Sequence, residues 1–338
     1  MERYNRQARF APFGAEGQHQ LMKTRIMIMG GGALGSHLAE QLARMGVGHL
    51  TVIDMDVVEL SNLHRQALYD EHDAESMSPK VEVLKKKIGR INRHVGFDAL
   101  HVEMTPRNIE EILDVYQPDI VLDGMDNFEM RFLINEACHK LGIPWVYGAA
   151  VGSKGTVYAV DYTGPCLKCM LDIIPDTGES CAINGVLPPA IHQVISYEIG
   201  EVIRHVSGEG FSKKLISFDI FTIKNQTMDI DGLKDGSCPV CDRSEYELLN
   251  KKESGPIEAL CGGTYLFRLK RAAFDSAEHL PGNIKKETPF VKLISYKDIE
   301  MTIFQDGRMN VYGIPSDDLA YDFYRTLLKS IRWPFLSL

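Results

Sequence analysis

The sequence predicts an α/β protein whose first part is a doubly wound, mostly parallel, Rossmann-like sheet, followed by a small C-terminal α+β domain. Buried-strand patterns alternate with helical patterns over the first 150 residues, as parallel sheets require. A glycine-rich turn joins the first strand pattern to the first helix pattern. The chain has 338 residues, more than the ~250 to 300 that one hydrophobic core usually supports. We therefore expect one large domain and one smaller domain.

The first elements have the order of a mononucleotide-binding βαβ unit. Residues 25–29 (RIMIM) form a short apolar run, which indicates a buried strand. The glycine turn 30–35 follows, and then helical periodicity from residue 36 to 45. The second strand, 49–54, ends on an acid, Asp54. Strand, glycine turn, helix and strand in this order are typical of a nucleotide-binding half-sheet.

The middle of the chain extends this alternation and then changes character. After Gly155 we expect a strand, a loop containing glycine and proline, a long helix and further strands. The expected strands are 120–122, 145–150, 156–160 and one around 215–221; the expected helices are 80–91, 128–141 and 190–206; the loop is 172–189.

The C-terminal part is predicted to be a separate domain. Residues 250–256 are charged and contain helix breakers, which suggests a linker. Beyond it we expect strands at 291–295, 299–305 and 309–312, a turn at 306–307, and a closing helix at 318–331. The predicted domains are therefore 1–250 and 251–338.

Composition excludes several classes of protein. Thirty-seven basic residues against 46 acidic ones give a formal charge of −9, so a nucleic-acid partner is not expected, because phosphates require a basic surface. The N-terminus is polar, and no apolar run approaches the ~18 to 20 residues of a membrane span. We expect a cytoplasmic protein without a membrane partner. Seven cysteines in such a chain favour reduced thiols or metal ligation over disulfides.

Four of the cysteines form two distant C-x-x-C pairs, Cys166 with Cys169 and Cys238 with Cys241. Each pair offers two thiolates from one tight turn, the usual way of holding a tetrahedral zinc ion. The alternatives are two unrelated pairs of buried cysteines, or disulfides. A zinc-braced second half is the favoured interpretation. It would hold the intervening segment, including Cys181, beside the rest of the domain.

The glycine turn and the acid that follows it are candidates for a phosphate and a ribose. Gly30, Gly32 and Gly35 would expose backbone N–H groups at a helix N-terminus and let a phosphate come close. Asp54 could accept hydrogen bonds from ribose hydroxyls. The same pattern is also typical of NAD or FAD sites, and Asp54 could instead cap a turn.

Basic and acidic residues farther along favour a triphosphate over a dinucleotide. Arg65 and Lys80 could neutralise phosphate charge, although each taken singly could be part of a solvated helix face. Asp126 follows the strand at 120–122 and could hold Mg²⁺. Alternatively, Asp126 or Asn127 caps the helix that begins at residue 128.

Together these motifs resemble the ThiF/MoeB (HesA) family, bacterial relatives of the ubiquitin-activating enzymes. The likeness covers about residues 1 to 250. The matching segments are Arg3-Tyr-Asn-Arg6-Gln7, Gly30–Gly35, Asp54-Met-Asp56, Ser61-Asn-Leu-His-Arg-Gln66, Pro79-Lys80, Asp126-Asn127, the two cysteine pairs and Cys181. The resemblance implies a homodimeric adenylyltransferase. Using ATP and Mg²⁺, such an enzyme activates the C-terminal glycine of a ubiquitin-like sulfur carrier that ends in Gly-Gly, of the ThiS (thiamine) or MoaD (molybdopterin) type.

The resemblance also implies roles for individual residues. Asp126 would organise Mg²⁺ and the attacking carboxylate, and Arg6 would reach across the dimer to the partner's ATP. The four paired cysteines would hold a closed, structural Zn²⁺. The implied nucleotide-binding set is Gly30, Gly32, Gly35, Asp54, Asp56, Ser61, Asn62, Arg65, Lys80, Asp126 and Asn127.

Three departures from the family pattern are visible. The run after Cys181 is Ala-Ile-Asn, where an acid is common, which weakens a role for this thiol in sulfur transfer. His64 stands where Gln is usual, and Gly263 stands where Arg is common in a C-terminal extension. The chain has no rhodanese-like loop, so a separate sulfur donor is expected.

Two other functions compete with this interpretation. An NAD-dependent oxidoreductase could use the same glycine loop, and tight NADH binding without ATP binding would favour it. A non-catalytic, zinc-containing scaffold could bind a carrier without activating it, in which case binding would be indifferent to ATP.

Overall fold

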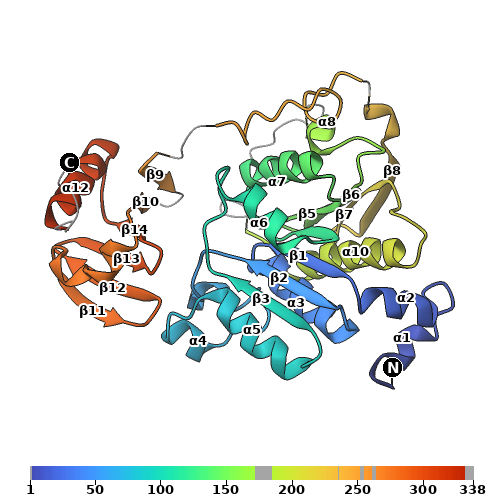
Figure 1. Cartoon of the computed structure of the whole chain (residues 1–338), viewed down its shortest axis with the longest axis horizontal. Coiled ribbons are helices and arrows are strands. Elements are labelled where there is room, and N and C mark those ends of the chain that lie inside the picture. The colour runs from blue at the N-terminus through green and yellow to red at the C-terminus, as the bar shows by residue number, and fades with distance from the viewer. Residues whose placement is uncertain (1, 172–184, 235, 252–254, 261–263, 332–338) are drawn as a thin grey trace. The chain divides into compact units, whose positions relative to one another are not determined.

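The computed structural model describes residues 2–171, 185–234, 236–251, 255–260 and 264–331. The chain forms two compact units, Met1–Lys251 and Lys252–Leu338. Figure 1 shows their helices and strands. No helix in the described part of the chain combines the length and hydropathy of a membrane span.

The first unit is built on an eight-stranded sheet with the order β3-β2-β1-β4-β5-β6-β7-β8. Neighbouring strands from β3 to β5 are parallel, and those from β5 to β8 are antiparallel. The strands are β1 (Arg25–Met29), β2 (His49–Ile53), β3 (Gly96–Leu100), β4 (Ile120–Asp123), β5 (Trp145–Val151), β6 (Lys154–Val160), β7 (Lys214–Asp219) and β8 (Lys224–Asp229). The chain order reverses between β1 and β4, so the carboxyl ends of these two strands mark the place where open α/β sheets bind ligands.

Helices cover both faces of this sheet, which confirms the doubly wound prediction (Figure 1). Ile26 and Ile28 of β1 point into one core, which α3 (Ala33–Met45), α5 (Lys80–Ile91) and α10 (Pro188–Val206) complete. Met27 and Met29 point into the other core, with α6 (Ile109–Tyr116), α7 (Phe128–Leu141) and α8 (Leu167–Leu171). Both faces of β1 are therefore buried, which explains its unbroken apolar sequence.

Helix ends follow local capping chemistry. The Asn127 side chain accepts a hydrogen bond from the Met130 N–H and caps α7, so the capping interpretation is correct for Asn127. Gly142, in the left-handed conformation, ends the same helix. Helix α3 begins at Ala33 and not at residue 36 as predicted, so that Gly35 lies in its first turn.

Several elements of the first unit were not predicted. They are the 3₁₀ turns η1 (Glu2–Tyr4), η2 (Leu60–Asn62) and η3 (Asp231–Leu233), the helices α1 (Asn5–Ala8), α2 (Gly14–Leu21) and α4 (Glu71–Glu75), and β3, α6, α8 and β8. Strand β3 has the sequence GFDAL and is only half-buried, so it lacks the apolar run that identifies β1. Strand β8 is exposed along its whole length.

The second unit is a six-stranded antiparallel sheet with the order β11-β12-β13-β14-β10-β9, packed with the helix α12 (Asp317–Ser330). This agrees with the predicted α+β class. Its other elements are β9 (Ile257–Leu260), β10 (Thr264–Arg268), α11 (Ala272–Asp275), η4 (Ala277–His279), β11 (Asn283–Glu287), β12 (Val291–Tyr296), β13 (Ile299–Phe304) and β14 (Arg308–Tyr312). Strands β9, β10 and β11 were not predicted.

Candidate active site

The glycine turn is packed too tightly for side chains at two positions. Gly30 has a φ of +98°, and a Cβ there would lie 2.6 Å from the Gly124 carbonyl oxygen. A Cβ on Gly35 would lie 1.8 Å from the Gly30 carbonyl oxygen. Glycine therefore lets β1, the first turn of α3 and the loop after β4 approach one another closely.

The N-terminus of α3 is open to a ligand. Gly32 is the N-cap residue, and none of the side chains that the structure describes caps this end of α3. A Cβ on Gly32 would meet only the Gln66 Nε2, at 3.9 Å. The Tyr69 hydroxyl donates to the Gly31 carbonyl oxygen at 2.7 Å and stabilises the turn. A free helix N-terminus with little side-chain cover suits a phosphate group.

Asp54 is already engaged by the backbone beside this turn. Its Oδ2 accepts the Gly31 N–H and its Oδ1 accepts the Asp56 N–H, both at 2.7 Å. The Asp54 side chain is 8% exposed, and burial raises its pKa, although Lys80 opposes the shift. Each carboxylate oxygen has two acceptor sites, so Asp54 retains capacity for ribose hydroxyls.

Lys80 is buried and paired, so the solvated-face alternative is wrong for this residue. Its Nζ lies 2.9 Å from the Asp56 Oδ2 and 4.0 Å from the Asp54 Oδ1, and its side chain is 6% exposed. Burial by itself would lower the pKa of Lys80, but the Asp54 and Asp56 carboxylates outweigh it and raise the pKa. Lys80 is therefore a fixed positive charge next to the glycine turn.

Arg65 lies in a second small cluster. One guanidinium nitrogen, Nη2, donates to the Asn62 Oδ1 at 2.6 Å, and Nη1 donates to the Ser61 carbonyl oxygen at 3.2 Å. Ser61 is exposed, and Arg65 and Asn62 are half-buried. Gln66, the next residue, is the one that faces Gly32. The cluster thus adjoins the open end of α3.

The loop after β4 carries Asp126 to the same edge of the sheet. Its Gly124 N–H donates to the Met29 carbonyl oxygen at 2.7 Å. Asp126 is exposed, and the Asn127 Nδ2 lies 3.4 Å from its Oδ1. The carboxylate is therefore available to a ligand, unlike Asn127, whose oxygen caps α7. We refer to Gly30–Gly35, Asp54, Lys80, Arg65 and Asp126 as the glycine-loop edge.

Arg6 is a predicted site residue that the structure does not bring to this edge. It lies in α1, where the neighbouring Gln7 donates to the Met45 carbonyl oxygen at 2.7 Å. Met45 ends α3, twelve residues after Ala33 at the start of the helix, so the helix spans about 18 Å at 1.5 Å per residue. The Arg6 side chain is exposed. Within one chain it lies at the wrong end of α3.

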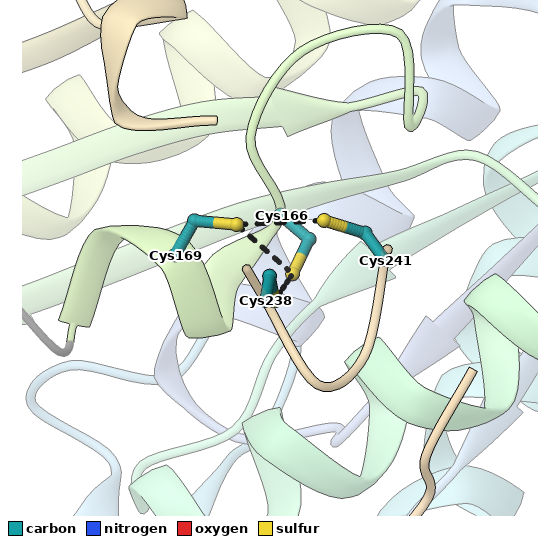
Figure 2. A group of neighbouring side chains, drawn as sticks. All are labelled: Cys166, Cys169, Cys238 and Cys241. Carbon is teal, nitrogen blue, oxygen red and sulfur yellow. Dashed lines mark hydrogen bonds between the residues drawn. The ribbon is translucent and has the colours of Figure 1, made fainter. Parts of the chain in front are cut away.

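The two cysteine pairs come together as one cluster, shown in Figure 2. The four Sγ atoms all lie within 4.8 Å of one another. Cys166 lies 3.9 Å from Cys169 and 3.7 Å from Cys238, and Cys169 lies 3.4 Å from Cys241. These separations exclude disulfides, whose sulfurs are about 2.05 Å apart. The alternative of two unrelated pairs is wrong as well.

The four-cysteine cluster has the dimensions of a tetrahedral zinc site. Four sulfurs at about 2.3 Å from zinc lie about 3.8 Å from one another, close to the distances given above. Hydrogen bonding from Cys169 and Asn135 lowers the pKa of Cys166 to about 5. Burial and the charge of Cys166 raise the pKa of Cys241 to about 12. A bound divalent cation would relieve this crowding of thiolates. Cys181 lies outside the described residues.

Sequence reasoning missed a buried polar cluster beneath the Asp126 loop. Asp123 and Arg131 form an ion pair of 2.7 Å, and both side chains are buried. Glu198 of α10 is fully buried next to Gly148, where an added Cβ would lie 2.0 Å from its Oε1. The signal in the sequence was an Arg and a Glu at apolar helix positions, which by itself does not identify their partners.

Comparison with known proteins defines the family. The model of the ThiF family matches residues 4–240. The sulfur carrier protein ThiS adenylyltransferase of Bacillus subtilis (strain 168) is 35% identical, over 94% of this chain and 96% of that protein. The molybdopterin-synthase adenylyltransferase of Escherichia coli (strain K12) is 33% identical, over 71% of this chain and 96% of that protein. The chain belongs to the ThiF family.

A solved structure supports the fold. The crystal structure of E. coli MccB with ATP has a TM-score of 0.59 and 23% sequence identity, and the match covers 71% of this chain and 74% of that one. At this identity the likeness shows the fold alone.

Proposed function

We propose that this protein is an ATP-dependent adenylyltransferase that activates the C-terminal glycine of a ubiquitin-like sulfur carrier. The observation that carries the proposal is the glycine-loop edge, which lies where the strand order reverses between β1 and β4. It combines an open helix N-terminus, a fixed cation at Lys80 and an exposed carboxylate at Asp126. Family relatives named as adenylyltransferases support the same chemistry.

Each group at the edge has a role in holding ATP. The backbone around Gly32 receives a phosphate, and Asp54 accepts hydrogen bonds from the ribose. Lys80 and Arg65 neutralise the triphosphate, with Ser61 and Asn62 fixing the Arg65 guanidinium. Asp56 in turn holds Lys80, and Gly30 and Gly35 permit the close packing. Asp126 is the ligand for Mg²⁺, which would balance phosphate charge when bound.

The reaction requires positioning more than covalent work by the protein. A carboxylate oxygen of the carrier's terminal glycine attacks the α-phosphorus of ATP, the bond to the β-phosphate oxygen breaks, and pyrophosphate leaves. The product is a mixed anhydride between the carrier and AMP. Fixed charges at Lys80 and Arg65 stabilise the charge that moves onto pyrophosphate, because they need no reorganisation during the step.

A homodimer completes the site in this proposal. Arg6 lies in α1 next to Gln7, which contacts Met45 at the end of α3 that is farthest from the glycine turn. It contributes to ATP binding only if a second copy places its α1 beside the edge. Mixing an inactive Arg6→Ala chain with an inactive Asp126→Ala chain would then restore activity in heterodimers that contain one intact site.

The carrier proposed first is of the ThiS type. The Bacillus subtilis relative named for ThiS matches both units of this chain. The molybdopterin-synthase relative matches 71% of it. The sulfur donor is a separate protein in either case.

The four-cysteine cluster is proposed to hold Zn²⁺ as a structural ion. All four donors are thiolates, so no ligand position is left for a substrate. The ion would join α8 to the segment that carries Cys238 and Cys241.

The direct test is formation of the carrier adenylate. The protein is incubated with ATP, Mg²⁺ and a ThiS-type or MoaD-type carrier, and the intact carrier mass is measured. An AMP adduct on the ThiS-type carrier, absent when the last glycine is deleted, is the expected result. Binding of carrier without any adduct and without dependence on ATP would favour the scaffold function. Binding of NADH in place of ATP would favour an oxidoreductase.

A further inference from the structure

A buried arginine is hydrogen-bonded to the loop that carries Asp126. Arg131 lies in the first turn of α7 and its side chain is 6% exposed. Its Nε lies 2.7 Å from the Asp123 Oδ2. Its Nη2 donates to two carbonyl oxygens, that of Met125 at 2.6 Å and that of Gly148 at 3.0 Å. One side chain thus ties the end of β4, the loop after it and β5 together.

The loop is held on its other sides as well. The Met125 N–H donates to the Asp123 Oδ1 at 2.8 Å. Gly124 packs against Gly30 of the glycine turn, where an added Cβ on Gly124 would lie 2.5 Å from the Gly30 carbonyl oxygen. The backbone immediately before Asp126 therefore has one position relative to the glycine turn. Asp126 itself is exposed and does not supply this constraint.

The surroundings of Arg131 stabilise its positive charge. Burial opposes the positive charge of Arg131, but the charge of its ion-pair partner Asp123 outweighs burial, so the pKa of Arg131 lies above its usual value. The guanidinium also lies over the rings of Phe128 and Tyr147, 5.4 Å from each centroid. A planar fork with several donors can engage a carboxylate and two carbonyls at once, which a lysine ammonium cannot do in the same geometry.

We propose that Arg131 is a positioning residue, which holds the Met125 backbone so that Asp126 meets the metal-bound triphosphate and the attacking carboxylate. The effect on the reaction rests on the proposed function, whereas the restraint of the Met125 backbone by Arg131 does not. Arg131 is too buried to touch a substrate. Its effect on the reaction passes through Asp126.

The test uses the full-length protein and the variant Arg131→Lys, which keeps a charge beside Asp123 and loses the fork. Hydrogen exchange of the Gly124 and Met125 amides should become at least about tenfold faster than in the wild type. Carrier-dependent exchange of pyrophosphate with ATP should fall on the order of 10²-fold in kcat, as expected for a displaced catalytic group. The KM for ATP should change by less than about threefold.

A double-mutant cycle separates positioning from general destabilisation. In an Asp126→Asn background, Arg131→Lys should have little further effect on kcat, because the group it positions is already lost. Tyr147→Phe, which keeps the ring against Arg131, is the matched control and should leave both measurements unchanged. If Arg131→Lys does not fold, the pair Asp123→Asn with Arg131→Gln removes both charges together and avoids an unpaired buried ion.

The possible results decide between the ideas. Unchanged amide exchange at Gly124 and Met125 overturns the positioning role, as does a full multiplicative loss of kcat in the Asp126→Asn background. A wild type that exchanges no pyrophosphate with any Gly-Gly-ended carrier overturns the proposed function. In that case, faster amide exchange in Arg131→Lys would still show that Arg131 restrains the backbone of the loop.

Discussion

The glycine-loop edge and the four-cysteine cluster are both polar assemblies inside the first unit, but they differ in what they leave free. At the edge, Asp126 is exposed, and Gly32 has almost no side-chain cover. In the cluster, four sulfurs face one another and three of the four cysteines are buried. An assembly with free ligand positions suits chemistry, and one that is saturated by its own donors suits stability.

Breaking the cluster should give the largest effect on the fold. Cys166→Ser removes a thiolate from a four-sulfur site, and the free energy of unfolding should drop by about 3 kcal/mol or more, because structural zinc binding contributes directly to folding. Calorimetry and zinc analysis measure this. Cys138→Ala changes a buried cysteine outside the cluster, and it should leave the measured zinc content at the wild-type value. A Cys166→Ser protein with unchanged stability would contradict the structural role.

Asp126→Ala should separate activity from stability at the edge. Because Asp126 is exposed, the unfolding free energy should change by less than about 0.5 kcal/mol. The kcat for adenylation should fall roughly 10² to 10³-fold, the usual loss when one preorganised electrostatic group is removed. Steady-state kinetics and a melting curve on the same preparation check both parts. Full activity would show that Asp126 has no such role.

Lys80→Met tests whether the edge also contains structural charge. It removes the Lys80 charge from its ion pairs with Asp54 and Asp56, of which Asp56 is half-exposed, so the free energy of unfolding should fall by about 1 to 3 kcal/mol. Lys87→Met on the same helix is the matched control. Lys87 pairs with Asp70 and Asp73 nearer the surface, and its loss should cost less than about 1 kcal/mol. Urea titrations of the two variants compare these values, and equal losses would refute the distinction.

Glu198→Gln concerns the buried acid beneath the edge. Burial, and next the charge of Asp123, raise the pKa of Glu198 well above its usual value. The folded state therefore keeps a proton that the unfolded state loses above about pH 4.5. The free energy of unfolding should therefore show no loss from Glu198 below that pH. Above it, the free energy of unfolding should fall as pH rises, by up to about 1.4 kcal/mol per pH unit.

In Glu198→Gln this pH-dependent loss of stability should be absent. The free energy of unfolding of the variant should therefore exceed that of the wild type by an amount that grows from pH 5 to pH 8. Urea unfolding at four pH values measures the difference. Glu201→Gln on the same helix, where Glu201 accepts the Ser212 N–H, is the control and should keep the slope. Parallel stability curves for wild type and Glu198→Gln would show that Glu198 is ionised in the fold.

The smallest effect is expected for Cys181→Ser. Adenylation uses no thiol in the proposed reaction, so the rate of adenylate formation should stay within about twofold of wild type. Thiocarboxylate formation in the presence of a sulfur donor is the second measurement, and a loss there would assign the thiol to sulfur transfer.

The sequence predicted the parts of the site that depend on local chain order. The glycine turn, Asp54 and Asp126 follow strands that the apolar pattern identifies, and the C-x-x-C spacing predicted that four sulfurs meet. It did not predict the Arg131 contacts, because they join residues from β4, α7 and β5. Strand β3 and the N-terminal helices were missed for a related reason. GFDAL becomes a strand by pairing with β2, and α1 and α2 contact the end of α3 through Gln7 and Gln18.

The central claim is that the glycine-loop edge activates a carrier carboxylate with ATP. Carrier-dependent exchange of radiolabelled pyrophosphate into ATP tests it most directly. The account predicts exchange with a carrier that ends in Gly-Gly, none when the terminal glycine is removed, and severe loss in Asp126→Ala with zinc content unchanged. Absence of exchange with every Gly-Gly-ended carrier tried, in a folded wild-type protein, would contradict it.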